Sequence, residues 1–333
     1  MSQTVVVTGC AGLLGTHLSR YLLNKGYRVI GVDDLSGGYS DFMPQHSDFL
    51  FYNLNLDASL YIDHIFNKYR PIACYHFGAY AAEGLSPFIR KYNYMNNIIS
   101  SASVINSCIN YDTKLIFTSS MAVYGNSPPP FHESMRPNPI DPYGIAKYAV
   151  EMDIAVGGDQ HGLRYNIIRP HNVIGIYQNI WDKYRNVIGI FIRKAINQEP
   201  ILVYGDGKQV RAFSDIRYYM EPFYKLLDDA HNGEIFNIGA DKYYTILEAA
   251  NLVKKVAAKY YIDTEIKHVE PRHEVKQAFC DHSKAKFLLD FEDKTDLESL
   301  IDEMFCWAMS EKDRPVKKFT YEIQKGIYEY WKS

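Results

Sequence analysis

The sequence predicts an α/β fold with a doubly wound parallel sheet, and three observations lead to this prediction. Apolar, β-branched runs alternate with helix-like runs, a glycine-rich turn follows the first apolar run, and two aspartates follow the second. Strand and helix units repeated at this spacing form parallel sheets with right-handed crossovers. Ligands of such sheets bind at the carboxyl ends of the strands. The residues at those ends are therefore the candidates for a binding site.

The first unit is an expected strand, 4–8, followed by Gly9, Gly12 and Gly15 and then by a helix-like run, 16–25. Glycines in this position allow a tight turn, a close approach of a pyrophosphate to the backbone, and close packing of helix on strand. The free N–H groups at the helix N-terminus favour phosphate. The pattern predicts a dinucleotide site.

The second expected strand, 27–32, ends in Asp33 and Asp34, and Asp33 follows Gly9 by 24 residues. A carboxylate at this distance can accept hydrogen bonds from the adenosine ribose hydroxyls. It would also repel a 2′-phosphate, so NAD is favoured over NADP. The alternative interpretation, that the two aspartates are turn residues alone, is weaker because they follow the glycine pattern.

The alternation continues along the chain. Further strands are expected at 49–52, 72–77, 114–118, 164–168 and 234–238, and helices at 59–69, 92–110, 143–156 and after Asn186. We expect a Rossmann-type domain over residues 1–170, to which 234–239 returns. A smaller α/β domain over residues 171–333 would then be interleaved with it and bind the substrate.

Tyr143 and Lys147 lie one helical turn apart, so their side chains can enter the same cleft. A phenol titrates at about 10, and a cation within about 4–6 Å lowers its pKa by favouring the phenolate. One lysine is too little for a base at neutral pH, so we expect a second cation, such as an oxidised nicotinamide. Ser120, 23 residues before Tyr143, could share a hydrogen bond with the same substrate oxygen. Without the dinucleotide pattern, a structural pair and a turn serine would be the simpler interpretation.

Composition excludes several other classes of protein. The chain has 333 residues and a net charge of -3, without the basic stripe that nucleic-acid binding needs. Its five cysteines and scattered histidines show neither disulfide-framework nor metal-ligand spacing. No apolar run approaches 18 residues, and no signal-like segment opens the chain. We expect a cytoplasmic protein without a metal site that binds small molecules.

Several motifs together resemble the extended short-chain dehydrogenase/reductases, and most closely the nucleotide-sugar epimerases of the UDP-glucose 4-epimerase type. They are Thr8-Gly-Cys-Ala-Gly-Leu-Leu-Gly15, Val32-Asp-Asp-Leu-Ser36, Thr118-Ser-Ser-Met-Ala-Val-Tyr-Gly125, Asp141-Pro-Tyr-Gly-Ile-Ala-Lys147, Arg169-Pro-His-Asn172, Tyr204-Gly-Asp-Gly207 with Arg211, and Phe236-Asn-Ile-Gly239. The resemblance extends from residue 3 to about residue 290.

The resemblance implies Ser120, Tyr143 and Lys147 as catalytic residues and NAD as cofactor. The implied NAD-binding residues are Gly9, Gly12, Leu13, Leu14, Gly15, Asp33, Asp34, Asn55, Leu56, Phe77, Ala79, Asn96, Tyr143, Lys147 and Pro170. Asn55 stands where the family often has Asp, which should weaken one adenine contact. In the family's mechanism, the tyrosine takes the 4-hydroxyl proton while hydride moves from C4 to NAD. The 4-keto sugar then turns over and takes the hydride back on its other face.

The resemblance also implies a set of residues that bind a nucleotide sugar, most simply a UDP-hexose. They are Ser120, Asn172, Asn186, Val187, Leu202, Tyr204, Arg211, Arg272 and Glu274. Leu202 and Tyr204 would flank the base, and Arg211 and Arg272 would clamp the diphosphate. Guanidinium groups suit this task because each can bond two oxygens at once.

Four departures from the family pattern bear on the substrate. Ala278 replaces a bulky aromatic residue found in some relatives, so we expect some activity on UDP-N-acetylhexosamines. Met121 and Ala122 replace the Asp-Glu pair of the 4,6-dehydratases, and Tyr177 stands where glucuronate epimerases tend to have Arg. Ile216-Arg-Tyr218 replaces a Val-Asp-Asp motif, for which the sequence offers no account.

Alternatives remain open at this point: a nucleotide-sugar dehydrogenase or 4-ketoreductase, a UDP-glucuronate 4-epimerase, and a non-catalytic dinucleotide sensor. Because the sensor would usually lack Tyr143 or Lys147, it is the weakest of these. We also expect a homodimer, since the apolar positions of the 92–110 and 143–156 helices would allow a four-helix seam between two subunits.

Overall fold

A computed structural model describes residues 2–332. Its largest element is a seven-stranded, all-parallel sheet with strand order β11-β6-β5-β4-β1-β2-β3. The strands are β1 Thr4–Thr8, β2 Arg28–Asp33, β3 Phe49–Asn53, β4 Ala73–His76, β5 Lys114–Thr118, β6 Tyr165–Pro170 and β11 Ile235–Ile238. The predicted fold class is thereby confirmed.

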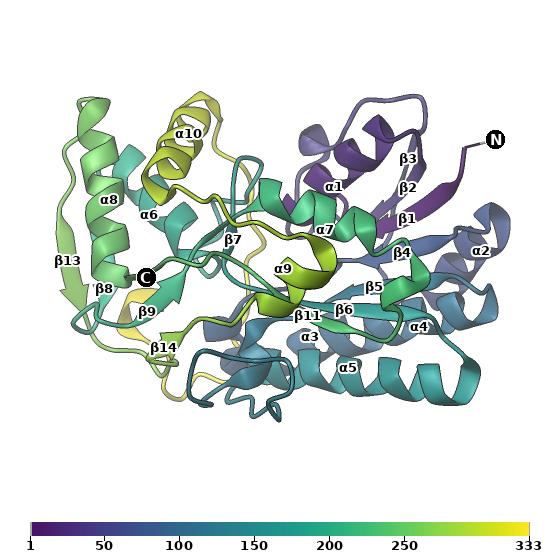
Figure 1. Cartoon of the computed structure of the whole chain (residues 1–333). Coiled ribbons are helices and arrows are strands. Elements are labelled where there is room, and N and C mark those ends of the chain that lie inside the picture. Colours follow the sequence, from purple (N-terminus) through teal and green to yellow (C-terminus); the bar gives the residue numbers. More distant parts are fainter. Residues whose placement is uncertain (1, 333) are drawn as a thin grey trace.

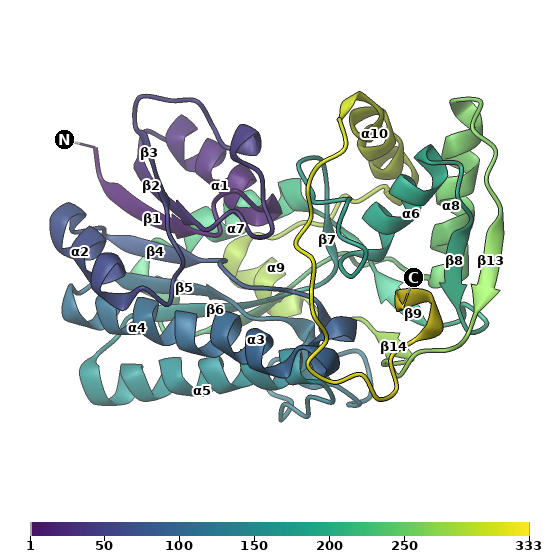
Figure 2. The ribbon, with the colours of Figure 1, turned by 180° about the vertical axis from the view of Figure 1, so that it is seen from behind.

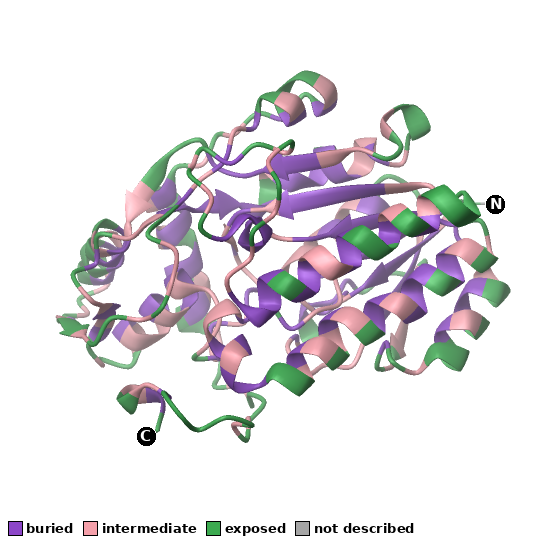
Figure 3. Ribbon diagram, turned by 90° about the horizontal axis from the view of Figure 1, so that it is seen from below, coloured by how far each residue is buried: buried purple, intermediate pink, exposed green. Residues whose placement is uncertain are grey.

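Helices cover both faces of this sheet, as Figure 1 shows. One face carries α1 (Leu13–Asn24), α7 (Met220–Lys225) and α9 (Ser283–Leu289), and the other carries α2 (Ser59–Tyr69), α4 (Ser100–Asn110) and α5 (Pro142–His161). Each helix buries one side against the strands and exposes the other, while the central strands are buried throughout (Figure 3). These two apolar layers fix the strand ends that surround the site.

A second, smaller part lies beyond the carboxyl ends of the strands (Figure 1). It contains the helices α6 (Val187–Ile196), α8 (Ile246–Lys259) and α10 (Leu297–Ser310) around their own apolar core. Its strands are β8 Ile201–Tyr204 paired with β13 Ile266–Val269, β9 Val210–Ala212 between β12 Tyr243–Thr245 and β14 Gln277–Ala278, and β7 Val173–Ile174 paired with β10 Ser214–Asp215. Because β11 follows α6 and β8 in sequence but precedes α8 and α10, the chain crosses between the two parts more than once.

The helix expected at 92–110 is interrupted. It consists of α3 (Arg90–Tyr94), a π-helical turn at Met95–Ile99, and α4. Polar side chains bond backbone carbonyls here, with Ser100 Oγ donating to Met95 O at 3.1 Å and Asn96 Nδ2 to Tyr92 O at 3.0 Å. Such bonds compete with regular helix geometry, and a π-helical turn is often found at a functional site.

Residues 311–332, the C-terminal segment, cross between the two parts of the molecule and end beside β9 (Figure 2). The Glu322 carboxylate accepts hydrogen bonds from Lys91 N at 2.7 Å and Tyr92 N at 2.9 Å, which satisfies free N–H groups at the start of α3. Trp331 packs on Phe88 with ring centroids 5.8 Å apart. The segment is therefore attached to the sheet part, although it follows the last helix of the second part.

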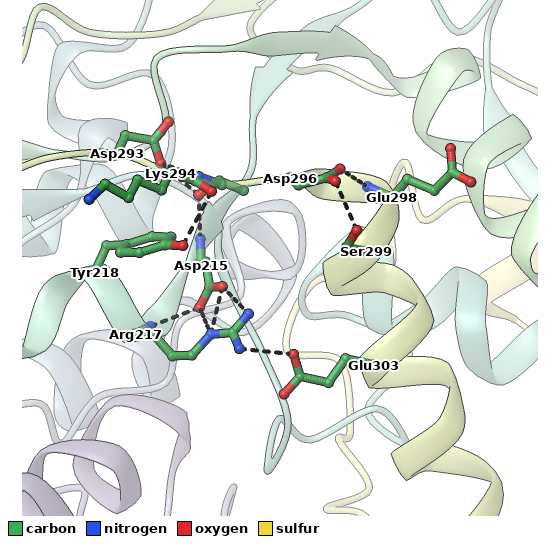
Figure 4. Close-up of polar contacts among 10 residues, drawn as sticks. Asp215, Arg217, Tyr218, Asp293, Lys294, Asp296, Glu298, Ser299 and Glu303 are labelled. Atoms are coloured by element: carbon green, nitrogen blue, oxygen red, sulfur yellow. Dashed lines mark hydrogen bonds and ion pairs between the residues drawn. The ribbon is translucent and has the colours of Figure 1, made fainter.

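The structure explains the Ile216-Arg-Tyr218 departure. The Asp215 carboxylate accepts a hydrogen bond from Arg217 N at 2.8 Å and so caps the 3₁₀ turn Ile216–Tyr219. It also pairs with the Arg217 guanidinium, which reaches Glu303 of α10 at 3.1 Å (Figure 4). Without an acidic pair inside the turn, this chain caps it with Asp215, the residue just before it, and Arg217 links the turn to α10.

No helix within residues 2–332 combines the length and the apolar character that crossing a bilayer requires.

Candidate functional site

A cavity of about 800 Å³ lies between the strand ends of the sheet and the second part. All sequence-predicted site residues line it. They are Gly9, Gly12, Leu13, Leu14, Gly15, Asp33, Asp34, Asn55, Leu56, Phe77, Ala79, Asn96, Ser120, Tyr143, Lys147, Pro170, Asn172, Asn186, Val187, Leu202, Tyr204, Arg211, Arg272 and Glu274. The structure thus brings together residues that the sequence separates by up to 265 positions.

The glycine turn has no room for side chains at two of its positions. A Cβ atom at Gly15 would lie 2.2 Å from Gly9 O, and one at Gly9 would lie 2.8 Å from Gly78 N. Gly9 also has a positive φ of 68°, which glycine adopts without strain. This close packing directs the N-terminus of α1 at the cavity. Gly12 is the N-cap residue, so no side chain caps the free N–H groups there.

Asp33 and Asp34 have structural partners as well as a place on the cavity wall. The two oxygens of Asp33 accept hydrogen bonds from Ala11 N at 3.0 Å and Leu35 N at 2.8 Å. Asp34 accepts one from Asn55 Nδ2 at 3.2 Å. Each carboxylate oxygen has a second lone pair, so both residues keep capacity for ribose hydroxyls. Asp33 therefore also fastens the glycine turn to the end of β2.

The cavity wall near β5 fits a bound polar ligand. Thr118 Oγ1 and Ser119 Oγ are buried and find no hydrogen-bond partner among the described residues, although both residues line the cavity. Buried hydroxyls are normally satisfied, so unsatisfied ones facing a cavity favour a ligand. With the uncapped N-terminus of α1, this wall suits a dinucleotide.

Tyr143 stands at the second position of α5. Asp141 begins the helix by accepting a hydrogen bond from Gly144 N at 2.9 Å, and Pro142 is well placed in the first turn. Tyr143 N donates to Ser86 Oγ at 3.1 Å. Ser120, which follows β5, lies near enough to the phenol of Tyr143 to lower its pKa. The structure therefore places the two predicted hydroxyl groups close together.

Lys147 lies one turn further along α5 and is 3% exposed. Its Nζ donates to Thr118 O at 2.8 Å and lies 4.8 Å from the ring centroid of Phe117. It lies 5.9 Å from the ring centroid of Tyr143. The lysine is therefore held between the end of β5 and the tyrosine.

The protein alone does not make Tyr143 acidic, in line with the expectation that a second cation is needed. Burial raises the pKa of Tyr143, and the hydrogen bond from Ser120 opposes this shift without cancelling it. Burial also lowers the pKa of Lys147 to about 7, while Glu151 opposes that change. Lys147 is therefore only partly charged at neutral pH. A stable phenolate needs further positive charge in the cavity.

Two arginines form the opposite wall. Arg211 Nη2 donates to Glu274 Oε2 at 3.0 Å, and Arg272 Nη2 lies 3.6 Å from the same oxygen. The Arg272 guanidinium stacks 4.0 Å from the ring centroid of Tyr204, whose ring also contacts Tyr330 at 4.7 Å between centroids. Glu274 thus holds both guanidinium groups side by side in the absence of a diphosphate.

Asn172 and Asn186 both anchor backbone. Asn172 Nδ2 donates to Ala212 O at 2.9 Å, and Asn186 Nδ2 donates to Val173 O at 2.8 Å. The buried Asn186 Oδ1 has no hydrogen-bond partner among the described residues. This oxygen remains free to accept a hydrogen bond from a ligand.

Sequence reasoning missed several residues of the cavity wall. They are Glu83, Asp141, Lys183, Arg185, Lys194, Tyr328, Tyr330 and Trp331. The dense aromatic residues of the C-terminal segment could have drawn attention to Tyr330 and Trp331. Nothing in the sequence near Glu83 indicates that this carboxylate would face the cavity.

Ala278 does not line the main cavity. It lies in a separate pocket of about 10 Å³ that also touches Glu83, Met121 and Arg211, all three of which line the main cavity too. These three residues therefore stand between Ala278 and the main cavity. The small side chain does not by itself open room for an acetamido group.

Comparison with known proteins agrees with this geometry. The chain is 28% identical over 326 residues to the UDP-glucose 4-epimerase of Halalkalibacterium halodurans, which covers 92% of this chain and 95% of that protein. It is 26% identical to the UDP-glucuronate 4-epimerase of Thermodesulfobacterium geofontis, with 91% and 95% covered. The solved structure of the Thermotoga maritima UDP-glucose 4-epimerase with UDP-glucose is 30% identical, with a TM-score of 0.86 and coverage of 92% and 98%.

Residues 5–239 match a family of NAD-dependent enzymes. This match, together with the similarity along nine-tenths of the chain, confirms the resemblance seen in the motifs and the choice of NAD as cofactor. The chain belongs to the NAD dependent epimerase/dehydratase family.

Proposed function

We propose that the protein is a 4-epimerase of a UDP-hexose of the glucose and galactose type. One observation carries the proposal: a single cavity joins the glycine turn and Tyr143 at one end to Arg211 and Arg272 at the other. This arrangement suits a diphosphate-linked sugar whose far end reaches the phenol. Residues 1–170 with 234–239 would hold NAD, and residues 171–333 would hold most of the substrate.

The chain's own residues would move a proton and hold the sugar in place. Tyr143 would take the proton of the sugar 4-hydroxyl, and Ser120 would share a hydrogen bond with the same oxygen. Lys147, which is close to half charged at neutral pH, would favour the phenolate when protonated. NAD, when bound, supplies hydride transfer and the positive charge of its oxidised ring. Arg211 and Arg272 would fix the diphosphate while the 4-keto sugar turns over.

The site favours epimerisation over the related chemistries. Water elimination needs an acid and a base beside the sugar, and Met121 and Ala122 occupy the positions where the dehydratases carry them. A dehydrogenase or 4-ketoreductase could use the same site. Either would consume the cofactor in stoichiometric amounts, whereas an epimerase regenerates it. Acetamido sugars remain a second possibility that requires Glu83 or Met121 to move.

The test is to incubate the purified protein with UDP-, GDP- and dTDP-sugars and to separate the products by chromatography. We expect interconversion of UDP-glucose and UDP-galactose without a stoichiometric change in NADH absorbance. Tyr143→Phe should lower kcat about 10²–10⁴-fold, because it removes the general base, while NAD affinity stays unchanged. Stoichiometric NADH formation would instead identify a dehydrogenase, and normal turnover by the variant would exclude Tyr143 as the base.

We further propose that two copies form a homodimer through α5 and the helical run 90–110. Side chains on this face are apolar and unusually exposed, including Met95 at 39%, Ile99 at 48%, Met152 at 49% and Val156 at 47%. Paired helices from two subunits would bury them as a four-helix seam. Light scattering at micromolar concentration should give twice the mass of the chain, and a monomeric mass would contradict this proposal.

A further inference from the structure

Glu83 is a carboxylate on the cavity wall with no assigned task. It begins the 3₁₀ segment Glu83–Phe88, which follows the loop after β4, and it lines the main cavity. Among residues 2–332, no hydrogen bond or ion pair engages its side chain. Burial raises the pKa of Glu83, and the nearby Arg211 opposes that shift. The Glu83 carboxylate faces the cavity without a direct partner among the described residues and is therefore available to a ligand.

The charges around Glu83 come from three other segments. Arg211 on β9, and Arg272 and Glu274 in the loop before β14, lie within electrostatic range of Glu83. Asp141 and Tyr143 at the start of α5 also respond to its charge. Arg211 and Arg272 favour the ionised form of Glu83. Because Glu274 already pairs with both guanidinium groups, and a diphosphate would engage them further, a second carboxylate placed beside Glu83 would find little compensating positive charge.

The place of Glu83 relative to the substrate rests on the proposed function. Tyr143 would meet the sugar C4, and Arg211 with Arg272 would meet the diphosphate on C1. Glu83 lies near both ends, since its charge affects Tyr143 and is affected by the two arginines. Gly84 confirms the proximity, because a Cβ atom there would lie 3.3 Å from Arg272 Nη1. If the substrate binds as proposed, the Glu83 side chain would therefore lie beside one edge of the sugar ring.

We propose that Glu83 determines specificity for an uncharged hexose: it accepts a hydrogen bond from a ring hydroxyl and repels a sugar that carries a carboxylate. In the ionised form, which Arg211 and Arg272 favour, the Glu83 carboxylate accepts hydrogen bonds and cannot donate them, which suits hydroxyl groups and disfavours a second carboxylate. Glu83, Met121 and Arg211 separate the main cavity from the small pocket at Ala278. Glu83 therefore also fills space that the small side chain of Ala278 would otherwise leave to the substrate.

Epimerisation makes this selection stricter. When the 4-keto sugar presents its other face, C1 and C4 keep their places while the 2,3-edge and the 5,6-edge of the ring exchange sides. Glu83 would face the 5,6-edge in one of the two orientations. A C6 carboxylate would therefore meet Glu83 in one half of the reaction, even if the other orientation bound well.

The test measures binding without turnover. Full-length protein loaded with NADH, which cannot oxidise the sugar, is titrated calorimetrically with UDP-glucose, UDP-glucuronate and UDP. The wild type should bind UDP-glucuronate about tenfold or more weakly than UDP-glucose, because like charges a few ångströms apart repel strongly in a partly dry site. Glu83→Gln keeps the shape and removes the charge, so the ratio should fall to about threefold or less. Loss of the charge beside Arg211 and Arg272 changes the affinity for the diphosphate of all three ligands alike, so UDP serves as the reference and the ratio of the two sugars isolates the effect at the sugar.

Glu265→Gln is the matched control, because Glu265 is exposed just before β13, does not line the cavity and carries the same charge. It should keep the wild-type ratio. Equal wild-type affinity for the two sugars, or an unchanged ratio in Glu83→Gln, would overturn the proposal. A purely structural role would weaken all three ligands together without changing the ratio, which also contradicts it. Turnover is assayed separately, so loss of the proposed epimerase activity would leave the binding result decisive for Glu83.

Discussion

The two walls of the cavity are built in different ways. The cofactor wall consists of backbone at strand ends and of residues in short sequence motifs, such as Gly9 to Gly15 and Tyr143 to Lys147. The substrate wall consists of side chains from separate loops and from the C-terminal segment, including Arg272 and Tyr330. A wall of the first kind tolerates little change in shape, whereas a wall of the second kind can vary with the ligand.

Gly15 provides the strongest test of the cofactor wall. Gly15→Ala should lower the free energy of unfolding by at least about 3 kcal/mol, because its Cβ would overlap Gly9 O at 2.2 Å and Cys10 Cα at 2.5 Å. Backbone atoms on both sides prevent an easy adjustment. Urea denaturation of the wild type and the Gly15→Ala variant measures this difference in the free energy of unfolding.

Gly12→Ala is the matched control, since a Cβ there has an ordinary 3.4 Å contact with Gly9 O. The fold should lose less than about 1 kcal/mol, as expected for a substitution without overlap. NAD affinity should nevertheless fall, because the new methyl group would stand at the uncapped N-terminus of α1. Equal destabilisation by both substitutions would show that the turn is not closely packed at Gly15 in particular.

Lys147 gives the cofactor wall a defined pH dependence. Its pKa of about 7 lies below that of an unfolded lysine, so between about pH 7 and 10 the unfolded chain binds one more proton than the folded protein. The contribution of Lys147 to stability therefore rises with pH across this window, by about 1.4 kcal/mol per unit, and is least favourable below pH 7.

Comparison with Lys147→Met isolates this contribution, because other groups titrate equally in both proteins. In the absence of cofactor, the free energy of unfolding of the wild type should rise relative to that of the variant between pH 7 and pH 9. Parallel stability curves would mean that Lys147 keeps an ordinary pKa. In that case the lysine would be fully charged at neutral pH, and the phenol of Tyr143 would need less help from the nicotinamide.

The C-terminal segment tests the substrate wall. Trp331 is 4% exposed and packs on Phe88 and Tyr184, so Trp331→Ala should detach the end of the segment, including Tyr330, from the cavity. We expect KM for the nucleotide sugar to rise about tenfold, the equivalent of about 1.4 kcal/mol, with NAD affinity unchanged. Exposed Ile323→Ala in the same segment is the control. A loss of NAD affinity would show that the two walls do not act separately.

This division also explains which features the sequence could predict. The glycines, Asp33 and the Tyr143–Lys147 pair are local patterns whose spacing is dictated by strand, turn and helix. These residues reached the cavity for that reason, whereas residues of the substrate wall such as Arg272 were indicated by the family resemblance. Glu83 and Tyr330 arrive there through loop paths and long-range packing, which leave no periodic signal. The perturbed pKa of Lys147 was equally hidden, because it depends on burial that only the assembled fold provides.

The smallest effects are expected behind the substrate wall, at the Asp215 turn. Arg217 is 54% exposed, so its ion pairs are screened by solvent, and Arg217→Ala should cost about 0–1 kcal/mol. Asp215 is 3% exposed and caps the turn through Arg217 N, so Asp215→Ala should cost about 1–2 kcal/mol. Urea denaturation can distinguish the two losses of stability, provided that both variants keep the m-value of the wild type. If Arg217→Ala proved the more damaging, the bridge to Glu303 rather than the Asp215 cap would be what replaces the family's acidic pair.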